Sequence, residues 1–179
     1  MVIESGEALR NHIRNVPDFP KKGIVFRDIT TLLKDKAAFR SAIDVFHDRY
    51  RASRIDKIVS VESRGFIFGS ALADRLGAGF VPVRKPKKLP SSTIREEYQL
   101  EYGSDALEIH TDAIIRGEKV LIVDDLMATG GTVAASCRLV EKLGGEIAGL
   151  AFLIELSFLN GREKLKRYDI FSIVKYDEE

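Results

Sequence analysis

Residues 120–132 read VLIVDDLMATGGT, a short apolar run that leads into two acids and a turn of small residues. The β-branched run at 120–123 is typical of a buried central strand. Apolar side chains then recur at helical spacing over 133–143, and Gly144 and Gly145 form a stop signal for that helix. A strand, a tight loop and a helix in this order place the loop at the carboxyl edge of an open sheet, where such folds bind ligands.

The residue types of this loop fit a phosphorylated ribose. Its alanine and glycines let backbone N–H groups approach an anion closely, and its threonines add hydroxyl donors. The two acids suit a sugar diol, because a carboxylate accepts two hydroxyl hydrogen bonds at once. The residues that we predict to bind a ribose phosphate are Asp124, Asp125, Ala128, Thr129, Gly130, Gly131 and Thr132.

Two familiar nucleotide-binding loops do not match the chain. A Walker loop requires lysine after its second glycine, whereas Thr132 follows Gly131, and no Gly-Lys-Ser/Thr sequence occurs anywhere. A dinucleotide fingerprint needs a third glycine, which is missing after Gly77 and Gly79. One alternative stays open, an ordinary strand-to-helix turn in which the two acids only cap the helix.

Length and composition predict a single domain over residues 1–179. The chain carries 28 basic and 27 acidic residues, and its net charge of +1 argues against nucleic acid as a partner. Its apolar stretches are too short for a membrane span, and the N-terminal residues do not have the pattern of a signal peptide. A single cysteine, Cys137, predicts a helix packing residue and suits a cytoplasmic location.

Helical and strand patterns alternate along the chain, which predicts an α/β fold with a mostly parallel twisted sheet flanked by helices. We expect helices over 4–14, 35–50 and 66–76, the second capped by Asp35 and the third ended by Gly77. Strands are expected at 57–61, 80–83, 119–123, 147–154 and 170–174. Period-two alternation on both sides of a turn at 103–105 predicts a hairpin that could close over the ligand edge as a flap.

The ribose-phosphate loop and several further motifs resemble the type I phosphoribosyltransferase family, and within it the members that use adenine. These further motifs are Val25–Asp28, Glu62–Phe66, Val81–Pro86, Leu89–Pro90 and Leu100–Gly103, and with the loop they cover nearly the whole chain. Lys87 stands where the family has glycine, and Met127 where leucine is usual. The resemblance implies the type I phosphoribosyltransferase fold, with an N-terminal hood over 1–34, a core over 35–179 and a flexible hairpin flap at about 86–110.

The same resemblance implies an activity, the formation of AMP and diphosphate from adenine and 5-phosphoribosyl 1-diphosphate, by a homodimer that uses Mg²⁺. The metal would be bound through the substrate, without dedicated protein ligands. Positive charge develops on the sugar during such a transfer, so Asp124 and Asp125 are expected to be catalytic as well. Glu101 is the expected base for the purine proton, with Glu96 and Glu97 as weaker rivals and a solvated strand glutamate as the alternative reading of Glu101.

The resemblance also predicts which residues bind the adenine and the diphosphate. The expected adenine-binding residues are Val25, Phe26 and Arg27, with the ring on the phenylalanine and the backbone of its neighbours at the polar edge. The expected diphosphate-binding residues are Arg64, Arg84 and Lys88, in preference to Lys85 and Lys87. On the residues alone, the basic cluster at 84–88 reads more readily as a solvated loop, and Phe26 as a core residue.

Two other functions stay open. A phosphoribosyltransferase for xanthine, hypoxanthine, guanine or orotate would share the ribose-phosphate loop and differ in the hood and the hairpin. A regulator could retain the loop to sense 5-phosphoribosyl 1-diphosphate, although the chain offers neither a helix-turn-helix domain before the core nor a basic surface charge for nucleic acid.

Overall fold

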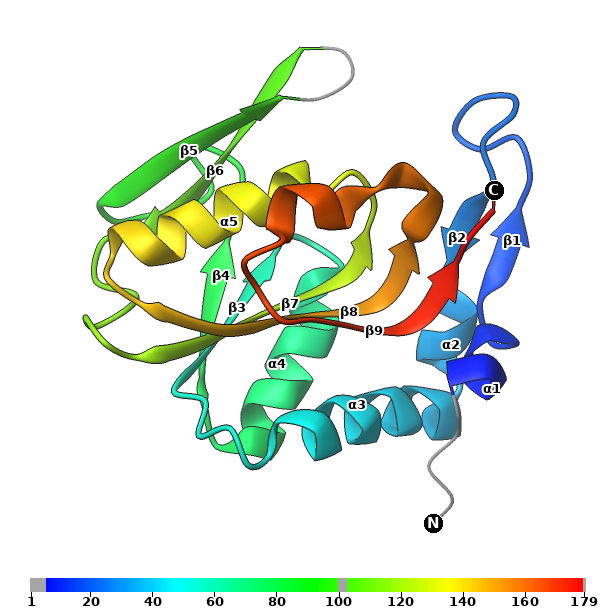
Figure 1. Ribbon diagram of the computed structural model, residues 1–179, viewed down its shortest axis with the longest axis horizontal. Helices are drawn as coiled ribbons and strands as arrows, with labels where there is room; N and C mark the ends of the chain where they lie inside the picture. Colours follow the sequence, from blue (N-terminus) through cyan, green and yellow to red (C-terminus); the bar gives the residue numbers. More distant parts are fainter. Residues whose placement is uncertain (1–5, 100–102, 179) are drawn as a thin grey trace.

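The computed structural model describes residues 6–99 and 103–178, and its centre is a five-stranded parallel sheet (Figure 1). In spatial order the strands are β4 (Gly79–Val83), β3 (Lys57–Val61), β7 (Lys119–Met127), β8 (Glu146–Leu156) and β9 (Ile170–Tyr176). Numbered along the chain within this sheet, the order is 2-1-3-4-5, a doubly wound arrangement whose direction reverses between β3 and β7. The predicted parallel sheet is confirmed, and all five strands occur where they were expected, although β7 extends past residue 123 to Met127.

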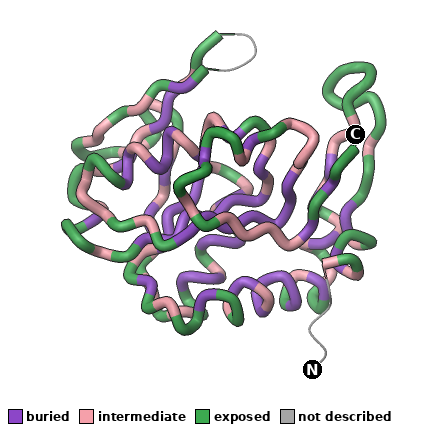
Figure 2. Tube along the Cα trace, in the orientation of Figure 1, coloured by how far each residue is buried: buried purple, intermediate pink, exposed green. Residues whose placement is uncertain are grey.

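Helices cover both faces of this sheet. The helices α3 (Lys36–Tyr50) and α4 (Gly65–Leu76) lie on one face, and α5 (Gly131–Lys142) lies on the other (Figure 1). Leu121 and Val123 of β7 belong to the hydrophobic core on the α3 and α4 side, whereas Val120 and Ile122 belong to the core on the α5 side. The continuous apolar run is therefore explained by burial from both sides (Figure 2).

The helix ends follow the predicted sequence signals. The side chain of Asp35 accepts hydrogen bonds from Ala37 N at 2.8 Å and Ala38 N at 3.1 Å, and so caps α3. These two hydrogen bonds hold the pKa of Asp35 below its ordinary value. Gly77 ends α4 with φ of 67°, the left-handed conformation that glycine adopts without a steric penalty.

The hood differs from its prediction. It consists of α1 (Gly6–Arg10), β1 (Arg14–Val16), β2 (Phe26–Asp28) and α2 (Thr30–Lys34). The helix expected over 4–14 is wrong beyond Arg10, and residues 4 and 5 lie outside the described part. Arg14 instead pairs with Asp28 in an antiparallel ladder, and its guanidinium binds the Asp28 carboxylate. Pairing with a segment that follows an irregular loop is a tertiary effect, which the local helical pattern of 4–14 does not contain.

The predicted hairpin exists as a separate two-stranded sheet of β5 (Thr93–Gln99) and β6 (Ser104–His110). Its turn was expected at 103–105, but Ser104 and Asp105 are paired strand residues that face Gln99 and Tyr98. The hairpin projects from the end of the molecule beside α5 (Figure 1). Two short 3-10 helices, η1 (Ser157–Leu159) and η2 (Gly161–Leu165), connect β8 to β9. Within the described ranges, no helix has the length and hydropathy needed to cross a membrane.

Candidate active site

The carboxyl edge of the sheet opens between β3 and β7. The two strands pair from Lys57↔Val120 to Ser60↔Val123, and beyond that point β7 continues only with β8, as far as Met127↔Glu155. The strand expected to end at Val123 is therefore longer than predicted, because β8 supplies hydrogen bonds for four more residues. Both acids lie in this extension, where one side of the strand has lost its partner.

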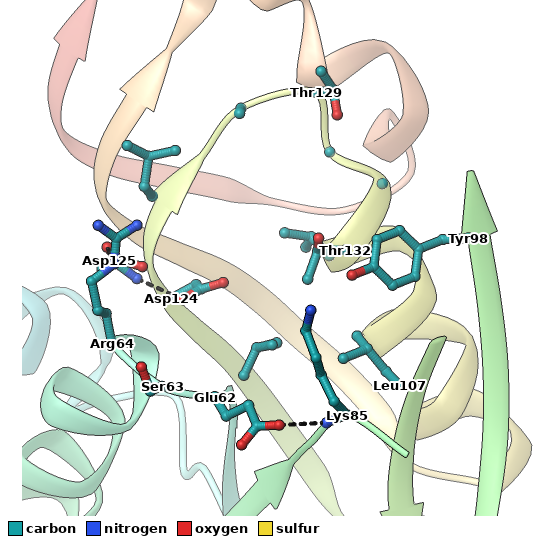
Figure 3. A pocket seen from close by; sticks show the side chains of 16 residues that line it. Glu62, Ser63, Arg64, Lys85, Tyr98, Leu107, Asp124, Asp125, Thr129 and Thr132 are labelled. Carbon is teal, nitrogen blue, oxygen red and sulfur yellow. Dashed lines mark hydrogen bonds and ion pairs between the residues drawn. The ribbon is translucent and has the colours of Figure 1, made fainter. Parts of the chain in front are cut away.

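A cavity of about 280 Å³ occupies this opening (Figure 3). It is bounded by the segment after β3, by the end of β7 with the loop that follows, and by side chains from the hairpin side. The structure brings together here the predicted residues Arg64, Asp124, Asp125, Ala128, Thr129, Gly130, Gly131 and Thr132. The lining residues that were not predicted to bind a ligand are Val61, Glu62, Ser63, Lys85, Tyr98, Leu107, Leu126 and Val133.

The two acids are buried and linked to each other. Asp124 is 8% exposed and Asp125 5%, and the backbone N–H of Asp125 donates to Asp124 Oδ1 at 2.9 Å. Burial and the charge of Asp125 raise the pKa of Asp124 well above its ordinary value. Burial also raises the pKa of Asp125, and the Arg64 guanidinium, with Nε 2.8 Å from Asp125 Oδ2, partly offsets that rise.

Gly65 lets α4 start close to these acids. A Cβ atom at this position would lie 2.5 Å from Asp124 Oδ1, so any other residue would push the helix N-terminus away from the carboxylate. The motif Glu62–Phe66 thus places Arg64 at the N-cap of α4 and glycine at its first position. Free N–H groups and the positive end of the helix dipole then face an acid pair that burial destabilises.

The loop after β7, residues 128–132, is called the phosphate loop below. Gly130 has φ of 76° and is the N-cap of α5, which begins at Gly131. A left-handed N-cap followed directly by a helix leaves several N–H groups pointing out of the first turn. The side chains of Thr129 and Thr132 lie at the rim of the same cavity (Figure 3). This arrangement has the geometry to bind an anion next to an acid pair.

The basic segment at 84–88 presents a different lysine from the one expected. The guanidinium of Arg84 donates to Glu62 Oε2 at 2.9 Å and to the Lys88 carbonyl at 3.1 Å, so its donors are engaged inside the segment. Lys85 instead lines the cavity, and its Nζ lies 2.9 Å from Asp105 Oδ2 of the hairpin. The carboxylate of Glu62 also accepts from Lys85 N at 2.7 Å. Diphosphate binding by Arg84 and Lys88 stays a prediction.

Glu62 is the residue that shapes this segment, and the sequence indicated it only as part of a motif. Burial raises its pKa, but the hydrogen bonds from Lys85 N and Arg84 outweigh burial and leave the pKa below its ordinary value. Lys87 has φ of 66°, a left-handed conformation that glycine adopts more easily than lysine. The left-handed backbone at Lys87 and the ion pair between Arg84 and Glu62 define the turn in which Lys85 faces the cavity.

The hood brings Phe26 next to Arg64. The guanidinium carbon of Arg64 lies 5.3 Å from the Phe26 ring centre, and Phe19 packs edge-on against the same ring at 5.2 Å. The side chain of Arg27 turns away, is 6% exposed, and lies 4.1 Å from the Tyr176 ring centre. The side chain of Arg27 is thus engaged away from Phe26, which leaves its backbone for a base, and base binding by Val25 and Arg27 stays a prediction.

Glu101, the expected base, lies outside the described residues. Of its two rivals, Glu96 is bound by Arg138 at 2.7 Å and by Lys142, both on α5, and these contacts hold its pKa below the ordinary value. Glu97 forms an ion pair with Arg95 at 3.1 Å. Glu96 is therefore engaged in attaching the hairpin to α5.

Two further expectations concern cysteine and metals. Cys137 is a buried packing residue of α5, as predicted, and burial raises the pKa of its thiol to about 12. Among residues 6–99 and 103–178, no three side chains of histidine, cysteine, aspartate or glutamate gather as a metal site.

Comparison with known proteins decides the family. A family model described as the phosphoribosyl transferase domain matches residues 28–178. This chain belongs to that family. The adenine phosphoribosyltransferase of Thermotoga neapolitana is 61% identical over 168 residues, which cover 94% of this chain and 99% of the relative. The adenine phosphoribosyltransferase of Acidobacterium capsulatum is 59% identical over 172 residues, covering 96% and 95%.

Solved structures of phosphoribosyltransferases share the fold. Adenine phosphoribosyltransferase from Thermoanaerobacter pseudethanolicus matches with a TM-score of 0.93 at 55% identity, covering 96% of this chain and 100% of that chain. The Saccharomyces cerevisiae protein, in complex with D-2,5-dideoxy-2,5-imino-altritol 1,6-bisphosphate and adenine, matches with a TM-score of 0.89 at 42% identity, covering 94% and 97%. The predicted type I phosphoribosyltransferase fold is confirmed.

The burial of the acid pair predicts that Asp124→Asn stabilises the phosphoribosyltransferase while impairing it. In the unfolded chain Asp124 ionises near 3.8, whereas the folded chain holds its pKa well above that value. Stability is consequently lost as pH rises between the two pKa values, and asparagine avoids this loss. We expect Tm to rise by about 2–4 °C at pH 7 for each kcal/mol gained, with the gain disappearing below about pH 4.

Thermal denaturation across pH 3.5–8 measures this effect, and Asp112→Asn on an exposed loop is the control, which should shift Tm little. The same Asp124→Asn variant should lose about 10²–10³-fold in kcat, with a smaller change in KM for 5-phosphoribosyl 1-diphosphate. A loss carried by KM alone would show that the carboxylate only binds the substrate.

Proposed function

We propose that this chain is a pentosyltransferase that forms AMP and diphosphate from adenine and 5-phosphoribosyl 1-diphosphate, and so returns free adenine to the nucleotide pool. The observation that carries the proposal is the opening between β3 and β7, where the buried acid pair and the phosphate loop border one cavity. An acid pair matches the ribose diol, and an anion site at the adjoining helix N-terminus matches the 5-phosphate.

The phosphate of the sugar would bind at the phosphate loop. Free N–H groups at the start of α5 donate to its oxygens, and the hydroxyls of Thr129 and Thr132 add further donors. Because α5 begins at the ligand edge of the sheet, the positive end of its dipole lies there and favours a dianion. Binding energy from this remote phosphate holds the reacting carbon in place.

The ribose hydroxyls would bind to Asp124 and Asp125. As the C1–oxygen bond breaks, the diphosphate leaves with its electron pair and the sugar ring gains positive charge. Two carboxylates close to that ring stabilise the charge where it develops. Burial disfavours the ionised forms of both acids and so raises their pKa values. A cation or hydroxyl donors in the cavity would stabilise the ionised forms and lower these pKa values again.

The leaving diphosphate would face Arg64 and the segment at 84–88. Arg64 lies beside the acid pair, and Lys85 is supported as a further ligand because it lines the cavity. Arg84 and Lys88 are not among the lining residues and remain predicted ligands. Binding of a diphosphate would compete with Asp105 for the Lys85 ammonium group. Such competition lets the hairpin respond to the diphosphate.

Magnesium fits this set of residues. Mg²⁺ prefers phosphate oxygens, waters and one or two carboxylates, and the carboxylates of Asp124 and Asp125 border the cavity, with Asp125 Oδ2 paired to the Arg64 guanidinium. When bound, the metal neutralises diphosphate charge. Asp124 and Asp125 would bind the ribose hydroxyls, and the substrate in turn would bind the metal.

The purine would attack C1 through its imidazole-ring nitrogen, which then loses a proton. Phe26 would support the purine ring, since it lies against Arg64, which lines the cavity. The predicted acceptor of the proton is Glu101. Closure of the hairpin would exclude water, which otherwise competes with adenine for the sugar cation.

Replacement of Glu101 by glutamine should lower kcat by about 10²-fold, because the base is removed while the size of the side chain is kept. The pH profile of kcat should lose its acidic limb at the same time. The control is Glu97→Gln, a strand glutamate paired with Arg95, which should retain the activity of the unaltered chain within a few-fold. Unchanged turnover in Glu101→Gln would remove this residue from the mechanism.

The base panel tests the function itself. The protein is incubated with 5-phosphoribosyl 1-diphosphate, Mg²⁺ and, in turn, adenine, hypoxanthine, guanine, xanthine and orotate, and nucleotide formation is followed. We expect AMP as the main product, with kcat/KM for adenine at least about 10²-fold above the other bases, since a site built for one hydrogen-bonding pattern leaves groups unpaired with another. Faster reaction with another base would change the substrate, and no reaction with any base would favour a regulator.

We also propose that the chain is a cytoplasmic homodimer. Phe19, Ile24 and Ile67 are large apolar residues that are 51%, 41% and 37% exposed. Phe19 packs on Phe26, which contacts Arg64, and Ile67 lies one turn after Arg64, so Phe19 and Ile67 are exposed near the same arginine. A single buried cysteine suits a reducing compartment. Light scattering should give the mass of two chains, and the mass of one chain under assay conditions would contradict the dimer.

A further inference from the structure

The phosphate loop rests on the backbone of a second segment, the start of η2. A Cβ atom on Gly130 would lie 2.6 Å from the Gly161 carbonyl oxygen. A Cβ atom on Gly161 would overlap the Ala128 carbonyl oxygen and lie 3.1 Å from Gly130 N. The two backbones are thus in direct contact, with a glycine on each side, and neither position has space for a side chain.

Gly161 is held in place by its neighbour. Arg162 binds Glu155 of β8 through two parallel hydrogen bonds, Nε to Oε1 at 2.6 Å and Nη2 to Oε2 at 2.8 Å. Glu155 is 2% exposed, and burial raises its pKa, but the hydrogen bonds from Arg162 leave the pKa below its ordinary value. The pair is therefore ionised and rigid, because a planar guanidinium fork fits a carboxylate in only one orientation.

The same glutamate is tied to the strand that carries the phosphate loop. Glu155 lies directly opposite Met127, the last residue of β7, in the parallel ladder. Leu165, at the other end of η2, is fully buried in the core beneath α5. The start of η2 is thus fixed to β8 at Arg162 and to the core at Leu165, which leaves Gly161 as a firm surface behind residues 128–130.

We propose that Gly161, held by the Arg162–Glu155 ion pair, is a positioning residue for the phosphate loop and so for binding of the sugar phosphate. This inference rests on the proposed function, which supplies the ligand of the loop. A chain with alanine and two glycines at 128, 130 and 131 loses much conformational freedom when it closes around an anion. Support from η2 keeps the N–H groups in the binding arrangement beforehand, which lowers that cost.

Gly161→Ala tests the proposal, because the added methyl must displace the Ala128 carbonyl. Inhibition constants for AMP and adenosine, which differ only in the phosphate, are measured against 5-phosphoribosyl 1-diphosphate. We expect the affinity for AMP to fall about 10- to 100-fold and that for adenosine to change less than about 2-fold. KM for 5-phosphoribosyl 1-diphosphate should rise in parallel, whereas KM for adenine should stay within about 2-fold.

Two control variants separate this effect from general damage. Gly79→Ala adds the same methyl at the opposite end of the sheet, against only the flexible side chain of Lys57, and should leave both affinities unchanged. Asp112→Asn, at an exposed position outside the cavity, should likewise leave both affinities unchanged.

Arg162→Lys provides a second test that does not depend on the folding of Gly161→Ala. Lysine keeps the charge next to buried Glu155 but cannot form both hydrogen bonds, so the AMP to adenosine ratio should fall by a smaller factor, about 3- to 10-fold. An unchanged ratio in the folded variants, or equal weakening of AMP and adenosine, would overturn the positioning role. Equal binding of AMP and adenosine by the unaltered chain would overturn the proposed function as well, so the two failures are distinguishable.

Discussion

The separation of β7 from β3 after Val123 is the constraint on which the site depends. A strand that keeps β8 as a partner but loses β3 presents its last residues to a cavity while its backbone stays in the sheet. Two adjacent carboxylates are thereby fixed on a rigid element at the reversal point of the doubly wound order. The surrounding site then has to tolerate buried negative charge.

Neighbouring segments compensate only part of that cost. Gly65 lets the positive end of α4 approach Asp124, and Arg64 places its charge on Asp125, yet burial still raises both pKa values. An acid pair left in this state is destabilising by itself and gains most from a ligand with hydroxyl donors and developing positive charge. The two buried acids that lower the stability of the folded chain are thus the residues that would favour ligand binding, a balance typical of active sites.

Local patterns in the sequence predicted most of the framework, and contacts between distant segments account for the rest. Asp35, Gly77 and the apolar run at 120–123 act through neighbours in the chain, so their effects could be read directly. The extension of β7 depends on β8, and the pairing of Arg14 with Asp28 depends on a ladder within the hood. Lys85 was passed over because no local signal shows that Glu62 engages Arg84 and leaves the adjacent lysine directed inward. The contact between Gly130 and Gly161, likewise, joins positions that are remote in sequence.

The ion pairs of Glu96 attach the hairpin to α5. Arg138 and Lys142 of this helix bind the hairpin strand β5, while the first turn of the same helix forms part of the phosphate loop. The helix α5 is therefore joined to the phosphate loop at its N-terminus and to the hairpin along one side. Because these ion pairs attach β5 to the helix whose first turn borders the cavity, a tilt of α5 would move the hairpin and the phosphate loop together.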